Sequence, residues 1–231
     1  EDKINKIMSE LTLLIPANKE VESLPSFLDE LNNYDYKILV VLQKEDTETI
    51  KSISHFKNIE ILIQKEKGYG SALKEGLRKI DTTFFCIINA DGSMDPSYLG
   101  QMLTSCLDKD LVFASRYLEG GGSDDDDLIT FFGNKVFSFT GNFLFNLNLS
   151  DILYTYVLGK TKLVRDLNLK YHDFRICVEL PILAKFRNLY FISLPSKERK
   201  RIGGKKKVNA LKDGFLILTA IIHLFYKKIS R

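Results

Sequence analysis

Residues 84–96 read FFCIINADGSMDP. The first part, Phe84–Ile88, is an apolar run that predicts a strand buried on both faces, as in a parallel sheet. The second part, Asn89–Pro96, places carboxylate, amide and hydroxyl oxygens directly behind that strand. Closely spaced hard oxygen ligands can hold a divalent cation, which in turn bridges a diphosphate. An Asp/Gly turn before a helix is the alternative interpretation of the same residues.

Similar apolar runs recur on both sides of this stretch. They are Leu11–Ile15, Ile38–Leu42, Ile59–Ile63, Phe84–Ile88 and Leu111–Ala114, with Leu189–Leu194 as one more expected strand. Residues with helical spacing separate them, as at Leu24, Phe27, Leu28 and Leu31 and in the segment that follows Gly70. This alternation predicts an α/β fold, with a mostly parallel central sheet flanked by helices.

Parallel sheets of this kind bind ligands at the carboxyl ends of their strands. Five segments follow the predicted strands there, and four of them are rich in Gly, Asp, Asn, Lys or Arg. They are Pro16–Glu20, Gln43–Asp46, Lys65–Ser71, Asn89–Asp95 and Ser115–Gly122. Glycines at a helix start can admit a ligand or simply form a turn. An arginine at a strand end can bind phosphate or form a surface ion pair.

Composition limits the classes of function. The 231 residues carry a net charge of +3, which argues against a dedicated nucleic-acid binder. Residues 197–207 (KERKRIGGKKK) are strongly basic and residues 124–127 are four aspartates, a pattern typical of solvated loops or of contact with an oppositely charged partner. Three cysteines without metal-type spacing indicate a reducing compartment. The N-terminal residues lack the apolar core of a signal peptide, so export is not expected.

The second half of the chain is dominated by two apolar segments. Residues 131–149 (FFGNKVFSFTGNFLFNLNL) predict a helix or a helical hairpin with a wide apolar face. In the tail, apolar residues recur at 3–4 spacing between basic ends, from Val208 to Ile229. This pattern predicts an amphipathic helix that lies in a membrane interface, with a dimer seam or packing on the domain as alternatives. No apolar stretch approaches the ~20 residues needed to cross a bilayer.

Six of the segments occur in an order that resembles family 2 glycosyltransferases of the GT-A fold. The likeness is greatest to the polyprenyl-phosphate branch, which includes dolichyl-phosphate mannose synthase-like proteins, and it covers roughly Leu11 to Gly214. Ile15–Glu20 resembles the strand and PAYNE of the family, Gly68–Leu73 its GxGxAL segment, and Asn89–Pro96 its DADxSxDP segment. Ser115–Gly121 resembles SRYxxGG, Asp151–Tyr156 resembles DxxxGY, and Glu198–Lys207 resembles ERxRxxGxSK.

The resemblance implies roles for matching positions. The nucleotide sugar would contact Pro16, Ala17, Glu20, Gln43, Gly70, Ala72, Asn89 and Asp91. A divalent cation, Mg²⁺ or Mn²⁺, would be held by Asp91 with Ser93 nearby. The acceptor phosphate and donor diphosphate would be received by Arg116, Lys135, Arg199, Arg201 and Lys206. The expected catalytic residues are Asp91, Arg116 and Asp151. Asp151 and Glu179 are also candidates for sugar-hydroxyl contact, with buried structural carboxylates as the alternative.

Two positions depart from the family pattern. Asn89 replaces the first aspartate of the DxD motif, which removes a charge but keeps an oxygen. Gln43–Asp46 stands where the family has DDGS, a loop that helps to hold the base and ribose; Asp46 is a candidate substitute.

The expected function is inverting, metal-dependent transfer of a hexose, mannose or glucose, from a GDP- or UDP-sugar to polyprenyl phosphate. The protein would act as a peripheral protein at the cytoplasmic face of a membrane, with a possible homodimer and no nucleic-acid partner. Residues 1–204 would form the glycosyltransferase domain and residues 205–231 the basic amphipathic helix. Alternatives are a glycan or protein acceptor on the same fold, or a non-catalytic module that binds nucleotide sugar or lipid.

Overall fold

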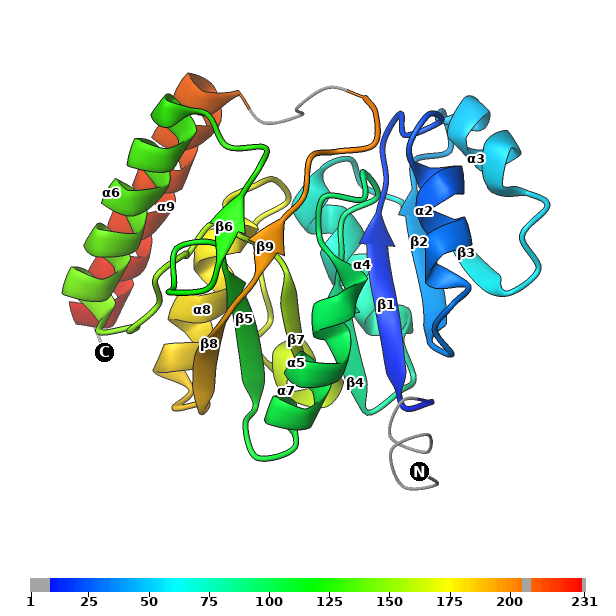
Figure 1. The fold of residues 1–231 in the computed structure, drawn as a ribbon. Helices are drawn as coiled ribbons and strands as arrows, with labels where there is room; N and C mark the ends of the chain where they lie inside the picture. The colour runs from blue at the N-terminus through cyan, green and yellow to red at the C-terminus, as the bar shows by residue number, and fades with distance from the viewer. Residues whose placement is uncertain (1–8, 205–208, 230–231) are drawn as a thin grey trace.

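The computed structural model describes residues 9–204 and 209–229, and it confirms the α/β architecture (Figure 1). A seven-stranded sheet has the order β3-β2-β1-β4-β7-β5-β8. The strands are β1 (Leu11–Pro16), β2 (Lys37–Leu42), β3 (Ile59–Ile63), β4 (Phe84–Ile87), β5 (Leu111–Ser115), β7 (Val157–Lys160) and β8 (Phe191–Pro195). All pairings are parallel except those of β7, which runs antiparallel to both β4 and β5.

Helices cover both faces of this sheet. One face packs against α2 (Leu24–Leu31), α3 (Thr47–Ile53) and α5 (Leu99–Cys106), which follows the short turn η1 (Pro96–Tyr98). The other face packs against α4 (Tyr69–Lys79), α6 (Leu128–Phe145), α7 (Thr161–Asp166), α8 (Ile176–Phe186) and α9 (Ala210–Ile229). In β1 the alternation of side chains sends Leu14 to the second core and Leu13 and Ile15 to the first, so the strand is buried on both faces and is apolar except for Thr12.

Two short strands add a second sheet over the carboxyl ends of the main strands. β6 (Gly122–Ser123) pairs in parallel with β9 (Lys197–Glu198), and Figure 1 shows this ribbon near the middle of the molecule. Met94 forms an antiparallel bridge with Glu198. The basic segment that begins at Lys197 is thereby held beside the turn that follows β4.

The two apolar segments of the second half form the helices α6 and α9, which lie side by side at one end of the molecule (Figure 1). Of the two alternatives predicted for residues 131–149, a helix or a helical hairpin, the structure has the single helix, which ends at Phe145, where Asn146 adopts a left-handed conformation. One face of α9 joins the core through Ile217, Ala220, Ile221 and Leu224. In the described part of the chain, neither these helices nor any other combines the length and hydropathy needed to span a bilayer.

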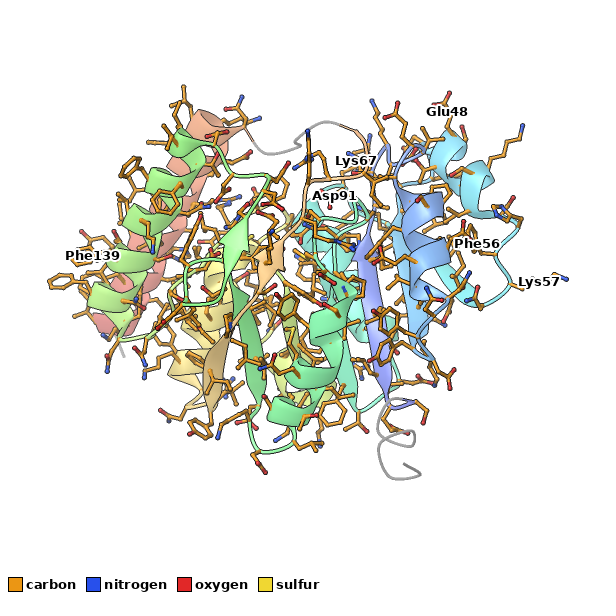
Figure 2. All side chains as sticks on the ribbon, in the orientation of Figure 1. Glu48, Phe56, Lys57, Lys67, Asp91 and Phe139 are labelled. Atoms are coloured by element: carbon orange, nitrogen blue, oxygen red, sulfur yellow. The ribbon has the colours of Figure 1, made fainter. Side chains whose placement is uncertain are left out.

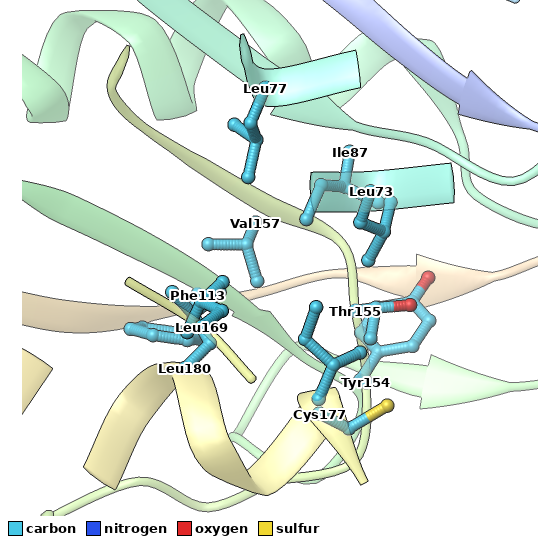
Figure 3. Close-up of a pocket in the computed structure, with 11 residues that line it drawn as sticks. Leu73, Leu77, Ile87, Phe113, Tyr154, Thr155, Val157, Leu169, Cys177 and Leu180 are labelled. Carbon is cyan, nitrogen blue, oxygen red and sulfur yellow. The ribbon is translucent and has the colours of Figure 1, made fainter. Parts of the chain in front are cut away.

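A small cavity of about 10 Å³ lies between the sheet, α4 and α8 (Figure 3). Its lining is mostly apolar and includes Leu73, Leu77, Phe113 and Leu180. This volume is at the lower limit for one water molecule. It is a packing defect of the core, not a ligand site.

Candidate active site

The turn behind β4 fixes the oxygens that the sequence singled out. The backbone N–H of Ser93 donates to Asp91 Oδ1 at 3.1 Å, which fixes the orientation of the carboxylate. Gly92 has φ of +73°, a left-handed conformation that favours glycine. Asn89 Oδ1 accepts a hydrogen bond from Tyr69 Oη at 3.3 Å. The amide that replaces the first motif aspartate is therefore engaged with the start of α4.

The basic segment after β9 lies directly beside this turn. The N–H of Arg199 donates to Ser93 O at 2.8 Å, and the N–H of Ile202 donates to Asp91 O at 2.9 Å. The Arg201 guanidinium binds Asp125 through Nη2–Oδ2 at 2.6 Å, and its Nη1 lies 3.6 Å from Asp91 Oδ2. Asp91, labelled in Figure 2, thus faces a cation supplied by the chain itself.

The residues around Asp91 fit a metal ion that is coordinated partly by the protein and partly by a bound ligand. Across residues 9–204 and 209–229, no group of three or more His, Cys, Asp or Glu side chains is arranged to hold a metal ion. Asp91 Oδ2 is one hard oxygen ligand, and the Ser93 side chain is buried next to it. Mg²⁺ is commonly bound by one or two carboxylates plus substrate phosphates. The residues therefore fit a cation completed by a diphosphate, with Asp91 as the main protein ligand.

The loop after β1 forms the neighbouring wall. Ala17 is buried and its N–H donates to Val41 O at 2.9 Å, immediately after Pro16 ends β1. Glu20 accepts a hydrogen bond from Ser23 Oγ at 2.8 Å, and its Oε2 lies close to Gly204. The loop after β1 and the segment at the far end of the chain therefore meet at this wall.

Asp46 does not lie open for a ribose in this structure. Its Oδ2 accepts from the Lys19 N–H at 2.6 Å, and its Oδ1 accepts from the Thr49 N–H at 3.4 Å as the cap of α3. Gln43 lies at the start of the same loop and accepts from the Asp46 N–H. The carboxylate ties the β1 and β2 loops together, which is a structural role.

Arg116 is the largest difference from the expected site. Its side chain is only 7% exposed and binds Asp151 through two hydrogen bonds, of 2.7 and 3.1 Å. Its Nη1 also contacts Asp126 at 3.2 Å and Glu198 at 3.1 Å. Burial alone would lower the pKa of Arg116, but the adjacent Asp151 and Glu198 raise the pKa well above its ordinary value. In this structure three carboxylates bind the guanidinium, and the expected contact of Arg116 with phosphate stays a prediction.

Asp151 and Glu179 also correspond to the structural alternative. The Asp151 side chain is fully buried and neutralises Arg116. Glu179 is buried in α8 and accepts from the N–H groups of Lys170 and Tyr171, at 2.8 to 3.0 Å. Both carboxylates already bind donors of the protein, so neither is presented to a sugar in this structure.

The remaining expected phosphate ligands differ in their surroundings. Arg199 binds Glu30 at 2.7 and 3.0 Å and the carbonyl of Gly92. Lys135 is exposed on α6, with Nζ 4.6 Å from the centre of the Tyr117 ring. Lys206 lies outside the described residues. Lys135 is therefore the exposed cation of this set among the described residues, whereas Arg199 and Arg201 are each paired with a carboxylate.

The glycines at the start of α4 admit another part of the chain. A Cβ on Gly68 would lie 2.1 Å from His172 O, and one on Gly70 would lie 2.6 Å from Tyr171 O. Ala72 is buried in the core on the next turn. In this structure the close backbone approach is made by residues 171–173, and the roles of Gly70 and Ala72 toward a nucleotide stay predictions.

Three of the four consecutive aspartates are counter-ions of basic side chains in the same protein and the fourth caps a helix, roles that sequence reasoning missed. Asp124 pairs with Lys197, Asp125 with Arg201 and Asp126 with Arg116, while Asp127 caps α6 through the Thr130 N–H. The signal was available, because a run of acids and a run of bases invite pairing. Glu198 was also missed, although it lies inside the ERxR segment.

Comparisons with known proteins identify the family of the chain. The model of the family described as glycosyl transferase family 2 matches residues 12–167. An uncharacterized glycosyltransferase of Mycobacterium tuberculosis strain H37Rv is 29% identical over 222 residues, which cover 95% of this chain and 98% of the relative. A protein of Mycobacterium bovis with the same description matches equally well.

Solved structures share the fold at low sequence identity. Glucosyl-3-phosphoglycerate synthase of M. tuberculosis, in complex with Mn²⁺, UDP and glucosyl-3-phosphoglycerate, superposes with a TM-score of 0.72 and 13% identity, covering 96% of this chain and 83% of that one. Mannosyl-3-phosphoglycerate synthase of Rubrobacter xylanophilus gives a TM-score of 0.67 and 13% identity, covering 99% and 76%.

The fold is GT-A-like, and the family model and the curated relatives make the protein a glycosyltransferase. The chain belongs to glycosyl transferase family 2.

Proposed function

We propose that the protein transfers a hexose from a GDP- or UDP-sugar to a polyprenyl phosphate, with a divalent cation and with inversion at the anomeric carbon. The observation that carries the donor assignment is the position of Asp91. It lies at the carboxyl end of β4, with Oδ2 directed toward Arg201 and with Glu20 on the wall formed by the β1 loop. This is the edge at which sheets of this type bind ligands.

The metal assignment follows from the same residues. Mn²⁺ or Mg²⁺ would be held by Asp91 and by the donor diphosphate, and would supply charge stabilisation for the departing nucleoside diphosphate. The M. tuberculosis synthase was solved with Mn²⁺ and UDP, and separately with Mg²⁺ and UDP. Asn89 keeps its oxygen bound to Tyr69, so Asp91 is the carboxylate on which binding would depend.

The chemical step needs little from a general base. An oxygen of the acceptor phosphate is already an anion and attacks the anomeric carbon. A carbon–oxygen bond forms as the bond to the diphosphate breaks, and the bonding electrons leave with the diphosphate. The protein then contributes alignment and positive charge near the leaving group, which Arg201 is placed to supply.

The lipid acceptor is supported by the surroundings of Tyr117. Asn134 of α6 donates to Tyr117 Oη at 2.9 Å, and Tyr117 Oη donates to Asp126 at 2.6 Å. Lys135 lies over the same ring. A cation therefore lies between the buried ion pairs of Arg116 and the exposed apolar side of α6. An acceptor with a phosphate head and an apolar tail fits this arrangement, with the phosphate near Lys135 and the tail along the apolar side of α6. With such an acceptor, the protein would act at the cytoplasmic face of a membrane.

A phosphorylated soluble acceptor is the second candidate. The named structural relatives are synthases of glucosyl- and mannosyl-3-phosphoglycerate. Phosphoglycerate and polyprenyl phosphate share a phosphate monoester. They differ in the apolar tail, and that difference allows an experiment to separate them.

The experiment incubates purified full-length protein with Mn²⁺ and a panel of radiolabelled GDP- and UDP-sugars. One arm contains polyprenyl phosphate in detergent and a second contains 3-phosphoglycerate. We expect label in the organic phase of the first arm, and loss of that label in Asp91→Ala. Label only in the phosphoglycerate product would overturn the lipid acceptor. Donor binding without transfer in any arm, including glycan and peptide acceptors, would indicate a binding module.

A further inference from the structure

The helices α6 and α9 expose an unusual number of large apolar side chains. On α6 these are Ile129, Phe132, Val136, Phe139 and Phe143, which are 61 to 78% exposed and recur every three or four residues. Phe139 is labelled in Figure 2 and points away from the body of the protein. They lie opposite the buried Asn134, Ser138 and Gly141, which face the interior. The exposed side of α6 is therefore as apolar as a core-facing side.

The helix α9 repeats the pattern. Leu211, Phe215, Leu218, Ile222 and Ile229 are 41 to 88% exposed and recur at intervals of three, four or seven residues. These residues belong to the tail stripe recognised in the sequence, while Ile217, Ile221 and Leu224 face the core. The predicted tail helix is confirmed as α9. The apolar residues with 3–4 spacing lie mostly on its solvent-exposed side. We call the exposed apolar side chains of both helices the α6–α9 face.

The two helices run in the same direction and present one continuous face. Lys228 of α9 donates to Leu144 O near the end of α6, and the Phe225 and Phe145 rings lie 6.2 Å apart. Earlier in the helices, a Cβ on Gly214 would contact the Phe137 ring at 3.8 Å. A helix of 18 residues is about 27 Å long. The face therefore extends far beyond a single exposed side chain.

Charge decides between the two occupants that such a face could take. The helix α6 contains one charged residue, Lys135, and α9 contains Lys212, Asp213, Lys227 and Lys228, so the two helices together carry four lysines and one carboxylate. A two-fold dimer brings the same patch of two subunits together. Such a contact through this face would set these lysines against apolar side chains or against one another. An anionic lipid surface supplies the opposite charge and accepts the phenylalanines as well.

We propose that the α6–α9 face docks the protein on an anionic bilayer, with both helices lying in the interface and Lys135, Lys227 and Lys228 at headgroup level. Docking in this way would bring the active site to a lipid acceptor in the bilayer. This role of the face rests on the proposed function. Lys135 reaches the Tyr117 ring from this face, so the docked protein would hold the acceptor side of the site at the membrane surface. Both α6 and α9 would contact the bilayer.

Vesicle flotation of the full chain, without donor or acceptor, tests the proposal. We expect binding to vesicles that contain phosphatidylglycerol and weaker binding to phosphatidylcholine alone. Phe139→Glu with Phe143→Glu should lower the vesicle partition coefficient at least about tenfold, and Phe215→Glu on α9 should also lower it. Ile63→Glu is the matched control, because Ile63 is 40% exposed on β3 at the opposite edge of the sheet. It should bind like the wild type.

The result that would overturn the proposal is equal flotation of the wild type and the Phe139/Phe143 variant, or no flotation of either. A dimer in light scattering that this variant dissociates, without vesicle binding, would assign the face to a second copy. Circular dichroism confirms that each variant is folded. Failure of the proposed function is a separate outcome. Vesicle binding without sugar transfer would support the docking proposal and reject the proposed function. Transfer to a detergent-dispersed acceptor without vesicle binding would reject the docking proposal alone.

Discussion

Arg201 lies with Nη1 3.6 Å from Asp91 Oδ2, so an arginine of the chain contacts the carboxylate that is proposed to hold the metal ion. The Arg201 and Asp91 side chains are 20% and 14% exposed, so the pair is partly shielded from solvent. Asp125 holds the same guanidinium at 2.6 Å from the other side. A cation and a nucleotide bound here would therefore meet a site whose charge is already partly balanced.

Replacing Arg201 should affect two kinds of ligand in opposite directions. Arg201→Gln removes a positive charge near Asp91, so Mn²⁺ should bind the free protein about threefold more tightly, whereas a nucleoside diphosphate should bind about tenfold more weakly. Calorimetry with each ligand measures both constants. Lys197→Gln is the control, since Lys197 pairs with the half-exposed Asp124. A change of the same sign for both ligands would contradict this account of Arg201.

Loss of Arg116 should destabilise the fold, whatever its effect on transfer. Arg116→Met leaves Asp126, Asp151 and Glu198 buried without their shared cation, and we expect a loss of about 3–5 kcal/mol in the free energy of unfolding. Urea unfolding measures this loss. Lys79→Met is the matched control, because Lys79 and Glu60 form an exposed pair, and its cost should stay below about 1 kcal/mol. Similar costs for the two variants would show that the cluster is not a structural centre.

The pH dependence of stability should reveal Glu198. Burial raises the pKa of Glu198 above its ordinary value of 4.5, although Arg116 opposes the shift. A carboxyl whose pKa is raised by folding contributes stability below its unfolded pKa, and this contribution is lost as the pH rises through the folded pKa. Glu198→Gln removes the titration. Its unfolding free energy relative to the wild type should therefore rise from pH 4 to pH 7, and a flat difference would contradict the shift.

The glycines at the start of α4 should respond differently from a glycine with free space. Gly70→Ala would place a methyl group 2.6 Å from Tyr171 O, and we expect a loss of about 1–3 kcal/mol because backbone must move. Gly100→Ala in α5 meets nothing within 4 Å and should stabilise the protein by up to about 1 kcal/mol. Thermal unfolding compares the pair. If Gly70→Ala were neutral, the contact with residues 171–173 would be looser than described.

The fold was predictable because its signals are local. Buried parallel strands are continuous apolar runs, and five expected strands match β1 to β5 to within one residue at each end. β7 was not expected, since four residues containing a glycine carry little pattern, yet it is the one antiparallel strand of the main sheet. α8 was missed as well, and Pro181 inside it interrupts the usual helical signal.

The site was less predictable because its partners are distant in sequence. The position of Asp91 followed from its strand, but the contact of Arg201 with Asp91 and Asp125 joins three separate segments. Sequence patterns identify residue types that suit phosphate, and they cannot show that Arg116 is already neutralised by Asp151. The same limit applies to the tail helix, where the spacing of apolar residues does not tell which side faces the core.

The central claim is that Asp91 binds the donor diphosphate through a divalent cation, and donor calorimetry tests it most directly. The wild type and Asp91→Asn, which preserves size and removes the charge, are titrated with GDP- and UDP-sugars in Mn²⁺ and again in EDTA. We predict that at least one donor binds the wild type in Mn²⁺, and that its affinity falls about tenfold or more in EDTA and in Asp91→Asn. Donor binding that is unchanged by both EDTA and the substitution would contradict the claim.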